Sequence, residues 1–151
     1  MAIAVEPALN PHLVVDDAAA AIDFYVKAFD AQELGRVPGP DGKLIHAALR
    51  INGFTVLLND DFPEMSGGTS MTPTSLGGTP VTIHLTVTDV DTKFQRALDA
   101  GATVIAPLDD QFWGDRYGIV ADPFGHHWSL SQPVREVSAE EIAAFTGQPS
   151  G

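Results

Sequence analysis

Cysteine is absent from the 151-residue sequence. The chain therefore has no disulfide framework, no thiolate metal site and no cysteine nucleophile, which excludes zinc-finger and thioredoxin-like proteins. A chain of this length can bury the core of one domain of common size, or of two small modules that share a core. It is too short for two full-size domains.

Basic residues are scarce. Eight Lys and Arg face twenty Asp and Glu, which gives a formal net charge of −12. Such a field repels nucleic-acid phosphates and anionic lipid, so we expect neither nucleic acid nor a membrane as a partner. An acidic surface of this kind keeps a protein soluble, and it also favours a cationic ligand over an anionic one.

Long hydrophobic runs are missing as well. No segment approaches the roughly 18 apolar residues of a membrane span. The N-terminal stretch "MAIAVEPALNP" lacks a basic region followed by a sustained apolar one, the pattern of a secretory leader. We expect a soluble, cytoplasmic protein.

What the sequence does contain is an internal repeat. The segment "HLVVDDAAAAIDFYVKAFDAQELGRV" (12–37) aligns with "HLTVTDVDTKFQRALDAGATVIAPL" (84–108) at an offset of 72 residues. The aligned pairs are His12 and His84, Leu13 and Leu85, Val15 and Val87, Asp17 and Asp89, Gly53 and Gly125, and Leu58 and Leu130. Because the register holds to the end of each half, the repeat indicates two copies of one structural module.

Each half has the same predicted order of elements. A short strand leads to an Asp that is suited to cap a helix, Asp17 or Asp89, and three extended segments follow the helix. The pattern predicts an α+β protein of two β-α-β-β-β modules, residues 1–60 and 81–135. Residues 61–80, rich in Gly, Pro, Ser and Thr, are expected to form a long exposed linker or binding loop without elements of its own. Residues 136–151 should form a terminal helix and tail, since Ser138 with Glu141 matches a capping box.

Strand alternation divides the side chains of the extended segments between two faces. The apolar face, which should pack beneath the helices, comprises Leu13, Val15, Ile45, Ala47, Leu49, Ile51, Ile83, Leu85, Val87, Trp128 and Leu130. The polar face comprises His12, His46, Asn59, Thr82, His84, His127 and Ser129. Such a polar face is either solvated or lines a cavity.

Two motifs, "HLVVDDAAAAIDFYVKAF" and "WGDRYGIVADPFGHHWSLSQPV", resemble the vicinal oxygen chelate superfamily. This superfamily includes glyoxalase I, extradiol dioxygenases, fosfomycin-resistance enzymes and bleomycin-resistance proteins, and the second motif is similar to a PhnB-like subgroup. The resemblance covers roughly residues 8–135. It implies paired β-α-β-β-β modules that curl an eight-stranded mixed sheet around a concave site, usually in a homodimer.

The resemblance also implies where a metal would bind. Metal-dependent members carry His and Glu ligands at positions that fall here on Asn10, Leu57, Thr82 and Ser129. A leucine cannot coordinate, and neutral hydroxyls hold divalent ions poorly without carboxylates or imidazoles beside them. We therefore expect no metal and no cofactor. Of the adjacent histidines, His126 is assigned to a turn and His127 to the rim of the site.

An alternative metal site stays open, because His12, His46 and His84 are predicted on one face. Three imidazoles can hold zinc or another late transition metal. In that case the protein would be a glyoxalase-like lyase, isomerase or transferase, with the metal polarising two substrate oxygens.

The segment "QFWGDRYG" (111–118) adds an aromatic feature. Alternation counted back from the "DPFG" turn places Trp113, Asp115 and Tyr117 on the concave side and Arg116 on the other. Two aromatic rings beside a carboxylate can stack a planar ligand and pair with a cation. Ordinary strand packing of the two rings, or an ion pair between Asp115 and Arg116, would explain the same residues.

Our leading hypothesis is a binding protein of the bleomycin-resistance type that sequesters a planar ligand, cationic or neutral, such as an antibiotic. The expected ligand-binding residues are His12, His46, Asn59, His84, Trp113, Asp115 and Tyr117. No catalytic residue is assigned. The metal-dependent enzyme is the second hypothesis, and a structural or regulatory dimer without ligand is the third.

Overall fold

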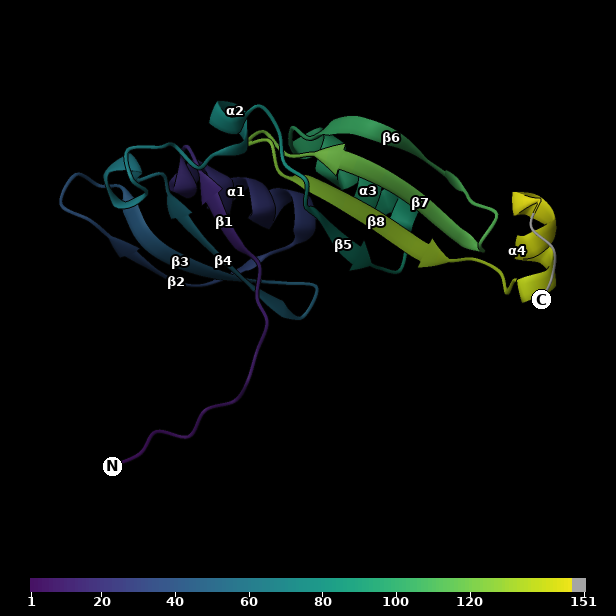
Figure 1. The fold of residues 1–151 in the computed structure, drawn as a ribbon, viewed down its shortest axis with the longest axis horizontal. Helices are drawn as coiled ribbons and strands as arrows, with labels where there is room; N and C mark the ends of the chain where they lie inside the picture. The colour runs from purple at the N-terminus through teal and green to yellow at the C-terminus, as the bar shows by residue number, and fades with distance from the viewer. Residues whose placement is uncertain (148–151) are drawn as a thin grey trace.

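The computed structural model describes residues 1–147 and contains the two predicted modules in sequence (Figure 1). The first consists of β1 (His12–Val15), α1 (Ala18–Phe29), β2 (Gln32–Pro38), β3 (Leu44–Ile51) and β4 (Phe54–Asp60). The second consists of β5 (Thr82–Thr86), α3 (Val90–Ala100), β6 (Thr103–Asp110), β7 (Asp115–Ala121) and β8 (His127–Pro133). The β-α-β-β-β order predicted from the repeat is therefore correct for both halves.

Each module forms its own four-stranded sheet. The strand orders are β1-β4-β3-β2 and β5-β8-β7-β6. β1 is parallel to β4 and β5 is parallel to β8, while the other neighbouring strands are antiparallel. The α+β class and the eight mixed strands are confirmed. Within residues 1–147, however, the two sheets share no strand pairing, so one chain does not by itself make a continuous eight-stranded sheet. The modules meet instead through α1 and α3, which lie side by side behind the sheets (Figure 1).

The start of α1 is fixed by two carboxylates. Asp17 accepts a 3.0 Å hydrogen bond from the amide of Ala20, as predicted. Asp60, at the end of β4, accepts a 2.9 Å bond from the amide of Ala18. Both bonds satisfy amides that the helix cannot pair internally.

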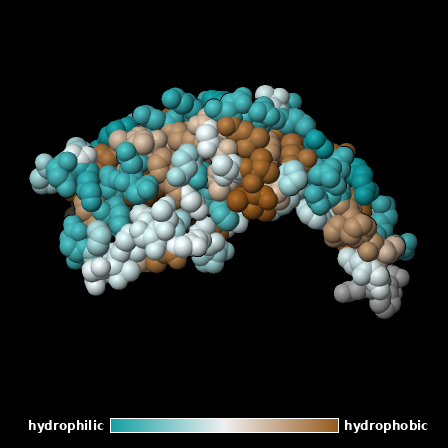
Figure 2. Space-filling model, turned by 90° about the horizontal axis from the view of Figure 1, so that it is seen from above, coloured by the Kyte–Doolittle hydropathy of each residue, from teal (hydrophilic) through white to brown (hydrophobic). Residues whose placement is uncertain are grey.

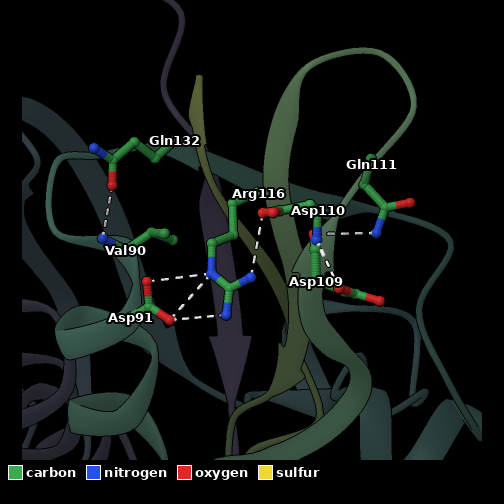
Figure 3. Close-up of polar contacts among 7 residues, drawn as sticks. All are labelled: Val90, Asp91, Asp109, Asp110, Gln111, Arg116 and Gln132. Carbon is green, nitrogen blue, oxygen red and sulfur yellow. Dashed lines mark hydrogen bonds and ion pairs between the residues drawn. The ribbon is translucent and has the colours of Figure 1, made fainter. Parts of the chain in front are cut away.

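The start of α3 differs. The predicted side-chain cap at Asp89 is wrong, because this residue adopts the left-handed conformation (φ 51°) and its side chain makes no capping bond. Gln132 of β8 accepts instead from the amide of Val90 at 3.1 Å (Figure 3). Gln132 follows Asp60 by 72 residues, as Val90 follows Ala18. The internal repeat therefore extends to the hydrogen bond between the last strand and the helix.

The linker is not without structure, contrary to the prediction. It contains the short helices η1 (Pro63–Met65) and α2 (Pro73–Leu76). The hydroxyl of Thr72, which is buried, accepts from the amide of Ser75 at the start of α2. A Cβ at Gly125, where φ is +89°, would lie 2.8 Å from Cβ of Pro73. The linker therefore packs on the turn before β8, and this turn requires glycine.

Aromatic side chains form the contact between the modules. Rings of Tyr25 and Phe29 from α1 lie 5.3 and 4.7 Å from the ring of Trp128, centroid to centroid. Trp128 is 0% exposed, in line with its predicted place in the core. The carboxylate of Asp122 accepts from the Tyr25 hydroxyl at 2.6 Å and from Trp128 Nε1 at 2.9 Å. The rings of Tyr25 and Trp128 are thus joined by hydrogen bonds to Asp122, and these bonds link the two modules.

Most of the predicted apolar face is buried, with one clear exception. Ile45 is 51% exposed. Val37 pairs with His46 whereas Pro38 pairs with Leu44, so Ile45 is the extra residue of a β-bulge. A bulge inverts the alternation of side chains at that point, which is why Leu44 takes the buried place.

The terminal helix α4 (Ala139–Thr146) begins where the capping box predicts, since Ser138 accepts from the amide of Glu141 at 3.1 Å. Residues 148–151 of the predicted tail lie outside the described residues. No helix in residues 1–147 is long and apolar enough to span a membrane.

Candidate functional site

The open face of the second sheet is defined by strand register. Thr86 pairs with Ser131 and Ser131 with Tyr117, so these three side chains form a row on one face. In the neighbouring row, His84 pairs with Ser129. The helices cover the opposite face of this sheet.

The contacts of Arg116 confirm that its side chain lies on the helix side of the second sheet and that those of its strand neighbours lie on the open face. Its guanidinium bonds to Asp91 of α3 at 2.9 Å and to Asp110 of β6 at 3.2 Å, on the helix side (Figure 3). The alternative pairing with Asp115 is therefore wrong. Asp115 begins β7 two residues before Tyr117 and shares the open face with it.

His84 is held by two hydroxyls. Its Nδ1 lies 2.7 Å from Ser129 Oγ and its Nε2 lies 3.1 Å from Ser131 Oγ. Both serines are almost fully buried, at 2% and 1% exposure. A neutral imidazole has one donor and one acceptor nitrogen, and rotatable hydroxyls can match either tautomer. Both nitrogens of His84 are thus occupied by the protein.

His12 occupies the equivalent place in the first sheet. Its Nε2 lies 2.6 Å from Oδ1 of Asn59. The amide nitrogen of Asn59 donates to the carbonyl of Asp60 at 2.7 Å, which identifies Oδ1 as the acceptor and His12 Nε2 as the donor. His12 precedes His84 by 72 residues, and Asn59 precedes Ser131 by the same number. In both modules, therefore, a histidine of the first strand is hydrogen-bonded to the equivalent residue of the last strand.

The remaining predicted residue of the first sheet, His46, lies beside His12. The two rings are 6.3 Å apart in an edge arrangement. The structure therefore brings together His12, His46 and Asn59 on one sheet, and places His84 on the other. At the position equivalent to Ser129 the first module has Leu57, whose side chain offers no hydrogen bond.

These residues do not fit a divalent metal within one chain. Among residues 1–147 no group of three or more His, Asp or Glu side chains is arranged to hold an ion. The hypothesis of a site formed by His12, His46 and His84 is therefore not supported, since His84 lies on a separate sheet with both nitrogens bonded. Of the family-like ligand positions, Asn10 precedes β1 and Ser129 is engaged by His84.

Five rings make a continuous series that we call the aromatic row: Phe145, Phe112, Trp113, Tyr117 and His84. Phe145 of α4 stacks on Phe112 at 4.2 Å with an interplanar angle of 8°. Phe112 meets Trp113 edge-on at 5.1 Å, and Trp113 meets Tyr117 at 5.7 Å and 70°. Tyr117 then lies 6.0 Å from His84 at 22°. The last three spacings lie within the range of about 4.5–7 Å for interacting aromatic pairs, and Phe145 and Phe112 are slightly closer.

The position of Trp113 differs from its prediction. It does not lie on β7, which starts at Asp115, but in the turn after β6. Gly114 has φ of +106°, and a Cβ there would lie 2.5 Å from the carbonyl oxygen of Arg135. Alternation therefore stops at Gly114 and cannot be counted through it. Trp113 is 39% exposed and still reaches Tyr117 from the turn.

Sequence reasoning missed Phe112 and Phe145 as members of this site. Arg135 connects them: its guanidinium donates to the carbonyl of Phe112 at 3.3 Å and to Glu141 of α4 at 3.2 Å. No local pattern indicates a contact between residues so far apart in sequence. Figure 2 shows the result, an arch with α4 at one end bent towards the hollowed side.

The comparisons with known proteins agree with this architecture. Residues 6–130 match the model of the Glyoxalase/Bleomycin resistance protein/Dioxygenase superfamily. An uncharacterized protein of Mycobacterium bovis is 82% identical over 152 aligned residues, which cover 100% of both chains.

Solved structures are similar as well. TioX from Micromonospora sp. ML1 is 28% identical, with a TM-score of 0.64 over 87% of this chain and 100% of that one. A PhnB protein from Bacillus cereus is 21% identical, with a TM-score of 0.63 over 83% of this chain and 99% of that one. The second likeness is one of fold.

Proposed function

Since the chain belongs to the Glyoxalase/Bleomycin resistance protein/Dioxygenase superfamily, we propose that it is a binding protein that sequesters a planar small molecule, cationic or neutral, on the aromatic row. The observation that carries this proposal is the series of five rings from Phe145 to His84, with the carboxylate of Asp115 on the same face.

Exposed ring surface supplies the affinity in this proposal. Trp113 is 39% exposed and Phe145 is 69% exposed, so both offer ring area to a ligand. Burying apolar area gains about 25 cal/mol per Å². The imidazole of His84, held between two serines, supplies a ring face whose orientation does not change when a ligand arrives, which limits the entropy lost on binding.

Charge supports the cationic version of the ligand. The net charge of −12 attracts cations over long range, and Asp115 gives that attraction a fixed point beside the rings. Planar cationic antibiotics are therefore the first natural compounds to test, because resistance by sequestration needs binding alone and no chemical step.

We further propose a homodimer. Strand β1 is at one edge of the first sheet and β5 at one edge of the second, and neither pairs with another strand there within residues 1–147, although the carbonyl of Val14 in β1 accepts from His126 Nε2 at 2.9 Å. Unpaired edges favour pairing with another chain. A second copy would bring two equivalent aromatic rows into one assembly.

The experiment is a fluorescence titration with 9-aminoacridine, a planar cation at pH 7.5, and with acridine, its neutral relative. Binding should saturate, and replacement of Trp113 by Phe should remove most of the change in tryptophan emission. Phe54→Ala is a matched control, since Phe54 is an exposed ring (74%) on β4, outside the aromatic row. Equal losses in both variants, or no saturable binding of either compound, would refute the proposal.

A further inference from the structure

A separate cavity of about 330 Å³ lies between the two modules, on the helix side of the sheets. Its walls come from the end of α1, the turn between β3 and β4, strands β5 and β8, and α3. The volume falls at the lower end of the range for small-molecule pockets, about 300–1,000 Å³. The cavity does not include any residue of the aromatic row.

The floor of the cavity is apolar. Phe29, Leu85 and Leu130 line it, and Leu85 and Leu130 belong to the buried core. Their side chains point to the helix side of the second sheet, whereas His84 and Ser129 point to the open face. A ligand here would therefore contact the opposite side of β5 and β8 from one on the aromatic row.

Positive charge is concentrated at this cavity. Three of the eight basic residues of the chain line it, Arg50, Lys93 and Arg96, against one acidic residue, Asp30. In a protein of net charge −12 this local excess is unusual. This local positive charge is also opposite in sign to the overall negative charge of the protein, which attracts cations elsewhere on its surface.

Two of the three cations are available to a ligand. Arg96 is engaged by the carbonyl oxygens of Lys27 and Val26 at the end of α1, at 2.6 and 3.4 Å, and lies 3.6 Å from Asp30. Within residues 1–147 the ammonium of Lys93 has one hydrogen-bond partner, the hydroxyl of Thr88 at 3.3 Å. Within the described part of the chain neither Lys93 nor Arg50 has a carboxylate within 4.0 Å.

We propose that this inter-module cavity binds an organic anion, with the apolar body of the ligand against Phe29, Leu85 and Leu130 and its carboxylate at Lys93 and Arg50. Guanidinium and ammonium groups form charge-assisted hydrogen bonds with carboxylates, and the apolar floor selects against small hydrated anions. The ligand would contact both modules, so its binding stabilises their association as well as the fold.

The experiment uses decanoate as the probe, with decan-1-ol as the neutral analogue of equal chain length. Isothermal titration at low ionic strength should give saturable binding of decanoate and at least fivefold weaker binding of decanol. Decanoate should also raise the melting temperature of the full chain. Lys93→Gln and Arg50→Gln should each weaken decanoate binding by at least fivefold and leave decanol binding unchanged.

Lys43→Gln is the matched control, because Lys43 lies outside the cavity, where it bonds to the carbonyl of Asp61 at 2.9 Å. This variant should bind decanoate as the wild type does. Equal affinity for decanoate and decanol, an equal loss in Lys43→Gln, or no binding at all would overturn the proposal. Trp113→Ala should leave decanoate binding intact; if it abolishes binding, the anion occupies the aromatic row and the cavity assignment is wrong.

Discussion

The hydroxyl of Tyr25 in the first module donates a 2.6 Å hydrogen bond to the carboxylate of Asp122 in the second, in the buried interface between them. Asp122 also accepts from Trp128 Nε1 and from the amides of Phe124 and His126. Four donors thus converge on one buried carboxylate. The contact between the modules is specified by this network as well as by apolar area.

Tyr25→Phe should lower the free energy of unfolding by about 1.5–3 kcal/mol, the scale for a hydrogen bond to a charged group. Burial, followed by the charge of Asp122, raises the pKa of Tyr25 well above its usual value of 10.0. Ionisation therefore favours the unfolded chain, so this contribution is present below about pH 10 and is lost as pH rises above it. Urea unfolding between pH 7 and 11 should show a smaller loss of stability at high pH in Tyr25→Phe than in the wild type. Tyr117→Phe, on the open face, serves as control.

Trp113→Ala should weaken binding of 9-aminoacridine by about 1–3 kcal/mol, the range for stacking of a planar base on an aromatic side chain. The free energy of unfolding of Trp113→Phe should lie within about 1 kcal/mol of the wild-type value, because the side chain is partly exposed. If Trp113→Ala unfolds the protein and leaves the affinity of the folded fraction unchanged, the ring has a structural role instead.

Asp115→Asn should weaken binding of 9-aminoacridine more than binding of acridine. It should also reduce the dependence of the first affinity on salt, because counterions screen the charge and not the stacking. Titrations of both compounds between 20 mM and 500 mM NaCl, about a 25-fold range over which the Debye length falls several-fold, will check this. Asp99→Asn is the control, because Asp99 is an exposed carboxylate on α3, on the helix side of the same module.

Purified protein should contain no stoichiometric divalent metal. The physical reason is the donor set: both nitrogens of His84 are bonded to serines, and Leu57 stands at a family-like ligand position. Elemental analysis that finds about one zinc, nickel, iron or manganese per chain, lost on replacing His12 or His84, would favour a metal-dependent enzyme.

Light scattering at micromolar concentration should give the mass of a dimer, about twice the 16.0 kDa of the chain. Val14→Pro removes a backbone donor from the edge strand β1. If β1 pairs with a second copy, this variant should shift the equilibrium from dimer towards monomer. A monomeric wild type would contradict the proposed assembly.

The repeat predicted the fold well, because hydrophobic alternation is a local signal and the 72-residue offset shows the same alternation twice in one chain. Asp17, Ser138 and Trp128 lie where these signals place them. The errors arose where backbone geometry breaks the alternation, at the bulge of Ile45 and at Gly114. Asp89 was assigned a cap that a residue 43 positions away, Gln132, provides.

The candidate site was only partly visible in the sequence. Strand alternation correctly placed His12, His46 and Asn59 on one face of the first sheet, and Tyr117 and His84 on one face of the second. Alternation gives no distance between the two sheets. The three histidines were therefore predicted as one cluster, whereas His84 lies apart from His12 and His46. Phe145 could not be found, because its contact with Phe112 depends on how α4 leaves the second sheet.

The two parts of the aromatic row, which meet near Gly114, are held with different firmness. The carbonyl oxygen of Gly114 accepts from the amides of Val134 and Arg135, so the turn that carries Trp113 also anchors the segment leading to α4. A ring entering between Phe112 and Phe145 displaces only a terminal helix, whereas one entering beside Tyr117 meets a paired strand and a histidine fixed by two buried serines. If the proposed ligand binds along this row, we expect α4 to shift and the end at Tyr117 and His84 to stay fixed, so that ligands of different length would be accommodated on the α4 side.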